Sequence, residues 1–347
     1  MRINKRVSIL SVIRWTWHHI VWLTLGAGCI ALLYRFQILT INLPWLPVSV
    51  IGTAVAFYVG FKNNSSYDRM WEARKIWGGI VNESRSWGMM VDAFITNQFT
   101  QKKVSKEEIY NIKKRLIYRH IGWLYAHRSQ LLIATPWEHI SQSGATGRRA
   151  KFLQQKFGIG LLDDEVTQTE LKIFLPKSEL HRLINYNNTA AQIITEQGRD
   201  LRQLRDANLI DDFRHMELSN VLKSFYTLQG KNERIKKFPL PRQYANMSFY
   251  FVAIFIILLP FSMIPSLMEL IPNSLSGFLL SVLITALVGW VYVMMEVIGD
   301  YSENPFQGMA TDIPMLSLCR GIEIDLREML EETELPPIIE AKNGVLM

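Results

Sequence analysis

The sequence predicts an all-α membrane protein in which two transmembrane hairpins flank a large helical cytosolic domain. Three observations predict this fold: four strongly apolar segments, an uneven distribution of Lys and Arg around them, and apolar residues at helical spacing in the region between. Of the 347 residues, 49% are hydrophobic, and the net charge is +7. Because the apolar segments and the charged middle region differ so strongly in composition, we expect them to lie in different surroundings.

The four apolar segments are expected to cross the membrane as helices. They cover approximately residues 15–36, 44–61, 245–265 and 275–295. Each reaches, or nearly reaches, the roughly 20 residues that span a hydrocarbon core ~30 Å thick. The first segment is expected to be a span rather than a cleaved signal peptide, because it is long and no small-residue cleavage site precedes the next span.

Charges beside the spans predict their orientation. Basic residues precede the first span at Arg2, Lys5, Arg6 and Arg14, and Lys and Arg are again frequent from Lys62 onward. The short links within the two hairpins carry almost no charge, with Arg35 beside one and Glu269 in the other. By the positive-inside rule, both termini and the whole middle region are expected in the cytoplasm, with the protein in the cell membrane.

The predicted domain organisation follows from these limits. It comprises a cytosolic N-terminal segment (1–14), a first hairpin (15–62), a helical cytosolic domain (63–244), a second hairpin (245–298) and a cytosolic C-terminal segment (299–347).

Within the cytosolic domain, helical periodicity is clear in three places. Apolar residues recur at helical spacing from Ile109 to Leu124. A second helix is expected to begin at Ser178, a candidate N-cap, and a third to end at Gly230, a natural helix stop. Residues 141–175 are mixed in character and receive no assignment, and the acidic run at 163–165 is expected to be a solvated turn rather than a cation site.

The sequence contains none of the motifs expected of an enzyme or a nucleic-acid-binding protein. GATGRRA, at residues 144–150, lacks the length and the Lys-Ser/Thr ending of a phosphate-binding loop. The seven His residues show no metal-ligand spacing, and the two Cys residues, Cys29 and Cys319, do not predict a disulfide framework. We therefore expect no catalytic residues, no cofactor, no metal and no nucleic-acid partner.

The second span carries a face that is a candidate for a functional lining. Thr53, Phe57 and Phe61 stand four residues apart, so they share one face of a helix. Periodicity alone favours a packing face within the bundle, because aromatic stripes usually belong to a core. The polar residues that follow are Asn63, Asn64, Ser65 and Ser66. They either cap the helix at the membrane interface or line a wet passage.

Beyond this polar run, the same helix is expected to continue through a tract dense in Trp, Arg and Glu. Its central residues are Arg69, Trp71, Glu72 and Arg74. Opposite charges three or four residues apart stabilise an exposed helix by only ~0.2–0.5 kcal/mol per pair. Since that is too little to explain so dense a tract, we expect stacked, partly buried ion pairs at an interface between neighbouring helices.

Three segments together resemble the bestrophin-like proteins. The first is GFKNNSSYDRMWEARKIWGGIVNESR (60–85), the second GKNERIKKFPLPRQY (230–244) and the third ENPFQGMATDIPM (303–315). They occur in the order that this family has them, between and after two pairs of spans, and the resemblance covers nearly the whole chain.

The resemblance implies a homopentameric ion channel, with five second spans around a central pore. In such a channel the polar run after the second span, with Asn63, Asn64 and Ser66, is the candidate polar lining. The resemblance places a hydrophobic neck at Thr53, Phe57 and Phe61, and a cytosolic constriction at Phe213. Leu209 or Ile210 take the last role if the alignment shifts slightly. Thr53 departs from the bulky apolar residue usual in the family. A calcium clasp is not expected, because only Asp300 and Glu303 follow the fourth span in place of a dense acidic run.

Several functions remain open from the sequence. The family label favours passive conduction of anions such as chloride, and a monovalent cation channel of the same architecture is the alternative. A non-conducting membrane scaffold or sensor is a further alternative. A secondary transporter ranks last, because the two hairpins show none of the inverted-repeat symmetry typical of that class, although Pro260 and Pro265 could break the third span. The spans also contain no buried Asp, Glu or Lys, residues that usually mark proton or substrate pathways, which argues against coupled transport.

Overall fold

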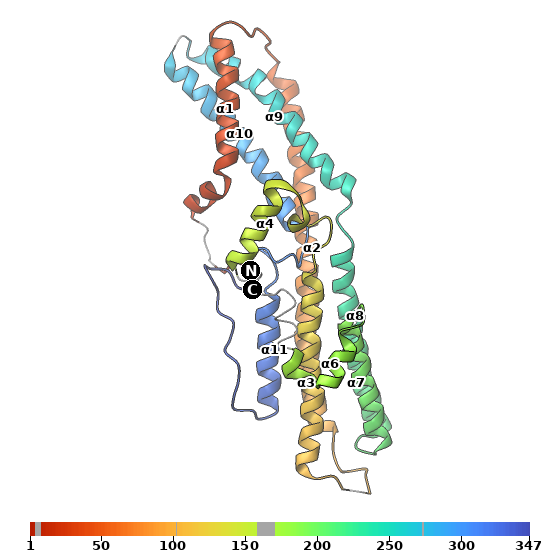
Figure 1. The fold of residues 1–347 in the computed structure, drawn as a ribbon. Coiled ribbons are helices and arrows are strands. Elements are labelled where there is room, and N and C mark those ends of the chain that lie inside the picture. The colour runs from red at the N-terminus through yellow and green to blue at the C-terminus, as the bar shows by residue number, and fades with distance from the viewer. Residues whose placement is uncertain (4–7, 102, 158–170, 273) are drawn as a thin grey trace. The chain divides into compact units, whose positions relative to one another are not determined.

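The computed structural model describes residues 1–3, 8–101, 103–157, 171–272 and 274–347. These residues form helices and loops, with isolated β-bridges at Arg2–Val345 and Lys342–Val345. The chain divides into two compact units. The apolar unit contains Asn4–Arg69 and Pro239–Asn304, and the helical unit contains Met1–Ile3, Met70–Phe238 and Pro305–Met347. Helix α2 (Trp45–Phe94) contributes to both, and it runs without a break for 50 residues (Figure 1).

The apolar unit is built from α1 (Ile9–Arg35), the first half of α2, α9 (Arg242–Leu270) and α10 (Leu275–Ser302). All four helices are long and apolar enough to cross a membrane, as the sequence predicts. Close packing depends on small residues: a Cβ at Gly52 would lie 2.7 Å from the ring of Phe255 on α9, and one at Gly289 would lie 3.0 Å from Leu23 on α1. Glycine therefore lets these helices approach closely.

Two prolines lie inside α9 without ending it. The helix continues past Pro260 and Pro265 to Leu270. Pro265 has no N–H group, so the carbonyl oxygen of Phe261, four residues earlier, loses its partner in the helix. That oxygen instead accepts hydrogen bonds from the backbone N–H of Leu43 (3.1 Å) and the hydroxyl of Tyr34 (3.4 Å). The hydrogen bond that Pro265 removes is thus replaced chiefly by the N–H of Leu43, in the loop after α1.

The helical unit contains the remaining helices and the main hydrophobic core. Its helices are the second half of α2, α3 (Lys106–Leu132), η1 (His139–Ser141), α4 (Gly144–Phe157), α6 (Lys177–Leu183), α7 (Thr189–Asp206), α8 (Asp212–Lys237) and α11 (Met315–Met329). Trp77 and Trp87 from α2, Trp123 from α3 and Phe225 from α8 are almost completely buried in its core. The N-terminal segment pairs with the C-terminal one, since the N–H of Ile3 donates to the carbonyl of Gly344 (3.0 Å) (Figure 1).

Helix boundaries in this unit differ from the sequence prediction in two places. The helix expected from Ser178 is divided, because α6 begins at Lys177 after Pro176 and ends at Leu183, and α7 begins after Asn188, whose side chain accepts from the N–H of Ala191. The prediction that a helix stops at Gly230 is wrong. Helix α8 passes through that residue and ends seven residues later, where basic side chains fill its last turn and Pro239 follows.

The unassigned part of the sequence also contains structure. Helix α4 lies within residues 141–175, to which the sequence assigned no element. The acidic run at 163–165, predicted to be a solvated turn, lies outside the residues that the structure describes.

Candidate functional site along helix α2

One face of α2 in the apolar unit is left uncovered by the other residues that the structure describes. Phe57 and Phe61 are 66% and 62% exposed, and Thr53 and Asn64 are exposed in the same row. These positions are three or four residues apart, which places them on one side of the helix. With Gly60 and Tyr292, among others, they line a shallow groove of about 490 Å³. The residues predicted as the neck therefore lie together on an open surface of the subunit.

The opposite face of α2 is packed inside the apolar unit. Val55 and Val59 are 4% and 0% exposed and belong to a cluster with Phe255 and Leu259 of α9. Thr53 directs its hydroxyl to its own helix, donating to the carbonyl of Ser49 (2.9 Å). The side of α2 that packs within the apolar unit is therefore the valine side, and among the described residues no buried cluster includes Phe57 or Phe61.

The polar run after Phe61 divides between the two faces. Asn64 continues the exposed row. Asn63 turns inward and donates from Nδ2 to the carbonyl of Met295 on α10 (3.0 Å), and Ser66 is completely buried. Successive helical residues point about 100° apart, so four polar residues in sequence cannot all face one side. This corrects the expected grouping: of Asn63, Asn64 and Ser66, only Asn64 lies on the exposed face.

A buried ion pair holds this part of α2 against its neighbours. Lys62 Nζ lies 2.5 Å from Glu296 Oε1 on α10, and the two residues are 1% and 8% exposed. Ser248 on α9 donates its hydroxyl to the other carboxylate oxygen of Glu296 (2.6 Å). Both ionised residues stand one position beyond the predicted limits of spans 2 and 4, which is why the sequence analysis found no buried charge. The predicted spans contain no Lys or Glu, which was an argument against coupled transport. The longer helices α2 and α10 do contain a buried Lys and a buried Glu, so the argument does not hold for them.

More polar groups gather toward the end of the apolar unit. Arg242 at the start of α9 donates to Glu303 (3.3 Å), which is 2% exposed and also accepts from Asn304 (3.1 Å). Burial raises the pKa of Glu303, Asp300 adds to this effect, and Arg242 and Lys62 oppose it. Arg69 is half-buried on α2, within electrostatic reach of Glu303 and Arg242. Its charge thus faces the interior of the subunit.

The tract after Arg69 is less buried than the sequence suggested. Trp71 is 47% exposed, and the guanidinium of Arg74 lies over its ring at 5.9 Å. Glu72 pairs with Lys75 at 2.7 Å, with the Lys75 side chain exposed and the Glu72 side chain partly exposed. Within one subunit these residues are not enclosed between helices, so their side chains are accessible for contacts with other molecules.

The predicted cytosolic constriction is also exposed. Phe213, in the first turn of α8, is 79% exposed, whereas the alternatives Leu209 and Ile210 are 4% and 1% exposed in the core. Of the three residues, only Phe213 presents an apolar side chain to solvent.

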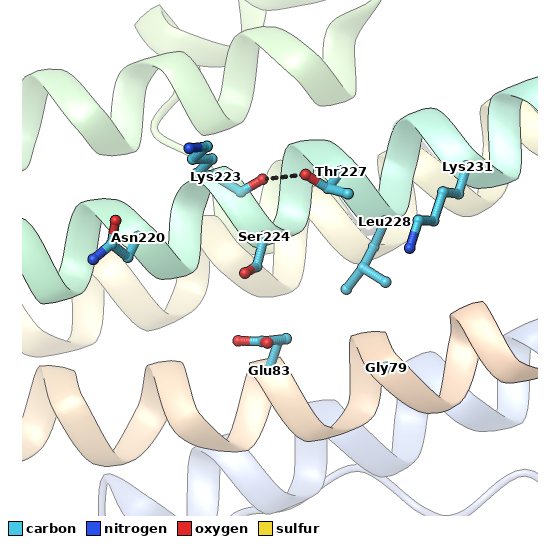
Figure 2. Close-up of a pocket in the computed structure, with 8 residues that line it drawn as sticks. All are labelled: Gly79, Glu83, Asn220, Lys223, Ser224, Thr227, Leu228 and Lys231. Atoms are coloured by element: carbon cyan, nitrogen blue, oxygen red, sulfur yellow. Dashed lines mark hydrogen bonds between the residues drawn. The ribbon is translucent and has the colours of Figure 1, made fainter.

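A groove of about 440 Å³ lies between α2 and α8 in the helical unit. Figure 2 shows Glu83 reaching from α2 toward α8, and Leu228 reaching from α8 toward Gly79. A Cβ at Gly79 would lie 3.0 Å from Leu228, so glycine allows the two helices to approach there. The α8 side is polar, with Asn220, Lys223, Ser224, Thr227 and Lys231.

No metal-binding group is found among the described residues. They contain no cluster of three or more His, Cys, Asp or Glu side chains suited to a metal ion. Asp312 in the third family-like segment is buried, and its carboxylate accepts hydrogen bonds from the N–H groups of Phe306 (3.0 Å), Gly308 (2.8 Å) and Ile313 (2.7 Å). This carboxylate therefore closes a loop in which Phe306 and Gly308 both have positive φ.

Comparisons with known proteins agree on one family. A model described as Bacterial/Fungal Bestrophin protein matches residues 5–328. The chain is 24% identical over 291 residues to the voltage-dependent anion channel-forming protein YneE of Escherichia coli K12, covering 84% of this chain and 78% of that protein. It is 26% identical over 309 residues to the voltage-dependent anion channel-forming protein RSc3414 of Ralstonia nicotianae, covering 89% and 84%. The crystal structure of a bacterial bestrophin homolog from Klebsiella pneumoniae superposes with a TM-score of 0.72 at 19% identity, covering 91% of this chain and 99% of that one, which shows a shared fold.

Proposed function

Because the chain belongs to the bacterial and fungal bestrophin family, we propose that it forms a homopentameric membrane channel for passive ion conduction. The pore is lined by the exposed face of α2, with a neck at Thr53, Phe57 and Phe61 and with Asn64 directly below it. Relatives are named anion channel-forming proteins, which favours anions such as chloride. A monovalent cation channel of the same architecture is the alternative.

The observation that carries this proposal is the uncovered, uncharged face of α2. Two phenylalanines that are more than 60% exposed in an apolar helix contact either lipid or another subunit. Around a closed symmetry axis, identical copies of such a face meet at the centre of a ring. A ring of aromatic side chains then forms a hydrophobic constriction of the kind that gates by dewetting.

Topology and further parts of the pore belong to the same proposal. Both termini and the helical unit lie in the cytoplasm, and the protein resides in the cell membrane. Phe213 forms a second constriction, because its side chain is exposed whereas those of Leu209 and Ile210 are buried. The tract from Arg69 to Arg74 contributes to subunit contacts through exposed Trp71 and Arg74, while Arg69 braces the interior of its own subunit.

The test is ion flux through purified protein reconstituted in liposomes. We expect flux without an energy source, and a Phe57→Ala variant that conducts several times better than the unmodified protein because its neck is wider. Leu283→Ala is the matched control, since Leu283 on α10 is 60% exposed, apolar and off the α2 face. Equal effects of the two substitutions would show that Phe57 does not line the pore. No flux from any variant would favour a scaffold or sensor.

Reversal potentials under asymmetric NaCl determine the sign of the permeating ion. A potential near that expected for chloride supports the anion channel, and one near that expected for sodium supports the cation alternative.

A further inference from the structure

The uncovered face of α2 carries no charge through the whole neck region. Between Trp45 and Tyr67 the only ionisable side chain other than tyrosine is Lys62. Lys62 is 1% exposed and paired with Glu296, so its charge is neutralised inside the subunit. In the sequence, a positive residue directly follows the neck. On the surface of the helix, that positive charge is absent.

The first charge on the exposed face is negative. Asp68 lies four residues after Asn64 and seven after Phe61, or about one and two helical turns, which keeps it in the row of the neck. Its side chain is exposed, and among the described residues it forms no ion pair. Arg69, the next residue, is half-buried, and its charge interacts with those of Glu303 and Arg242 inside the apolar unit. The positive neighbour therefore does not cancel Asp68 on this face.

We infer that Asp68 is a selectivity-determining residue, which lowers the permeability of anions relative to cations at the cytosolic end of the neck. The inference rests on the proposed function, because it needs α2 to line the pore. A neutral hydrophobic neck selects weakly between signs, so the first fixed charges beyond it have the largest effect. In a symmetric channel each subunit contributes one such carboxylate to a ring.

The size of the effect follows from Coulomb's law. In water, two unit charges about 7 Å apart interact with an energy close to RT. One carboxylate at this distance therefore changes the local concentration of a monovalent ion by about threefold, and further carboxylates add to the effect. Because the Debye length is about 8 Å at physiological ionic strength and about 30 Å at 0.01 M, the effect is largest at low salt.

The experiment measures the reversal potential of the full-length protein in planar bilayers under asymmetric NaCl at low ionic strength. We expect Asp68→Asn to lower the sodium-to-chloride permeability ratio by about threefold or more, Asp68→Lys to lower it further, and Asp68→Glu to keep it near the original value. Glu107→Gln is the matched control, because Glu107 is an exposed carboxylate on another helix, α3. Its ratio should not change.

A second approach avoids dependence on any single replacement. In an Asp68→Cys channel with Cys29→Ser, a negatively charged thiol reagent should restore the ratio and a positively charged one should lower it further. Unchanged ratios in Asp68→Asn and Asp68→Lys, with flux and with a Phe57→Ala response intact, would overturn the inference and leave the proposed channel standing. Absence of flux in the unmodified protein would overturn the channel itself.

Discussion

The Lys62–Glu296 pair should behave as a coupled unit whose single disruptions are far more harmful than its complete replacement. Lys62→Met leaves the carboxylate of Glu296 buried with one remaining donor, the hydroxyl of Ser248. Glu296→Met leaves the ammonium of Lys62 buried without its acceptor. The double variant with Met at both positions removes both charges and retains apolar volume on both helices.

The magnitude follows from the burial of both groups. Removing one partner of a buried pair costs about 3–5 kcal/mol, because an uncompensated charge stays in a poorly solvated place. Each of the two single replacements leaves one buried charge without its partner, so Glu296→Met and Lys62→Met should have costs of similar size. In the double variant, Ser248 keeps an acceptor because its hydroxyl is also within 3.0 Å of the carbonyl of Ala245. Its stability should lie within about 1–2 kcal/mol of the original.

The assay is thermal unfolding of the purified protein in detergent, with the three variants compared under one condition. At roughly 2–4 °C per kcal/mol, each single replacement should lower the midpoint by about 6 °C or more, and the double variant should recover most of that loss. A double variant as unstable as the sum of the two single variants would refute the reasoning, because independent sites add whereas a coupled pair does not.

Two further predictions concern the helical unit. Burial lowers the pKa of His120 to about 3 and that of His127 to about 4, so both are neutral when folded and take up protons only after unfolding below about pH 6.5. The free energy of unfolding should therefore be highest above pH 6.5, and it should fall by about 1.4 kcal/mol per pH unit per histidine down to about pH 4. Thermal unfolding midpoints that are equal at pH 7 and pH 5 would contradict this. Gly88→Ala should destabilise the unit by about 1–3 kcal/mol, because its Cβ would lie 2.6 Å from both Leu326 and Met329 on α11. An unchanged urea midpoint would show that α11 can move away at no cost.

Strong, repeated signals made most of the helical architecture predictable. Four spans follow from long apolar segments. The continuation of α2 beyond Phe61 was predictable because no Gly or Pro lies between Phe61 and Gly78, although the polar run at 63–66 contains residues that favour caps. Elsewhere the prediction was wrong, because polar side chains that cap a helix compete with its continuation. The break between α6 and α7 falls in NYNN at 185–188, where Asn188 caps the second helix, and asparagine favours caps and turns over helix interiors.

The buried ion pair was not predictable from the sequence, for a different reason. The uncharged runs that predict the second and fourth spans end directly before Lys62 and Glu296, so both residues fall just outside the predicted spans. Their partnership also joins positions 234 residues apart in the chain, and a single sequence contains no signal for such a distant contact. Helical geometry, by contrast, could have separated Asn64 from Asn63: the row of Thr53, Phe57 and Phe61, extended in steps of three or four residues, reaches 64 or 65 and then 68 or 69.

That last extension changes which charge matters for permeation. Read along the chain, the neck is followed by Lys62, and a positive residue at the end of a neck would favour anions. Read along the surface of the helix, Lys62 lies about 100° from Phe61, turned toward α10, where Glu296 neutralises it. The exposed row passes instead from Phe61 to Asn64 and Asp68. Lys62 therefore stabilises the packing of α2 against α10. Asp68 is the first charged residue on the exposed row after Phe61. The sign of the charge beyond the neck is therefore set by the rotation of α2, which the Lys62–Glu296 pair helps to hold.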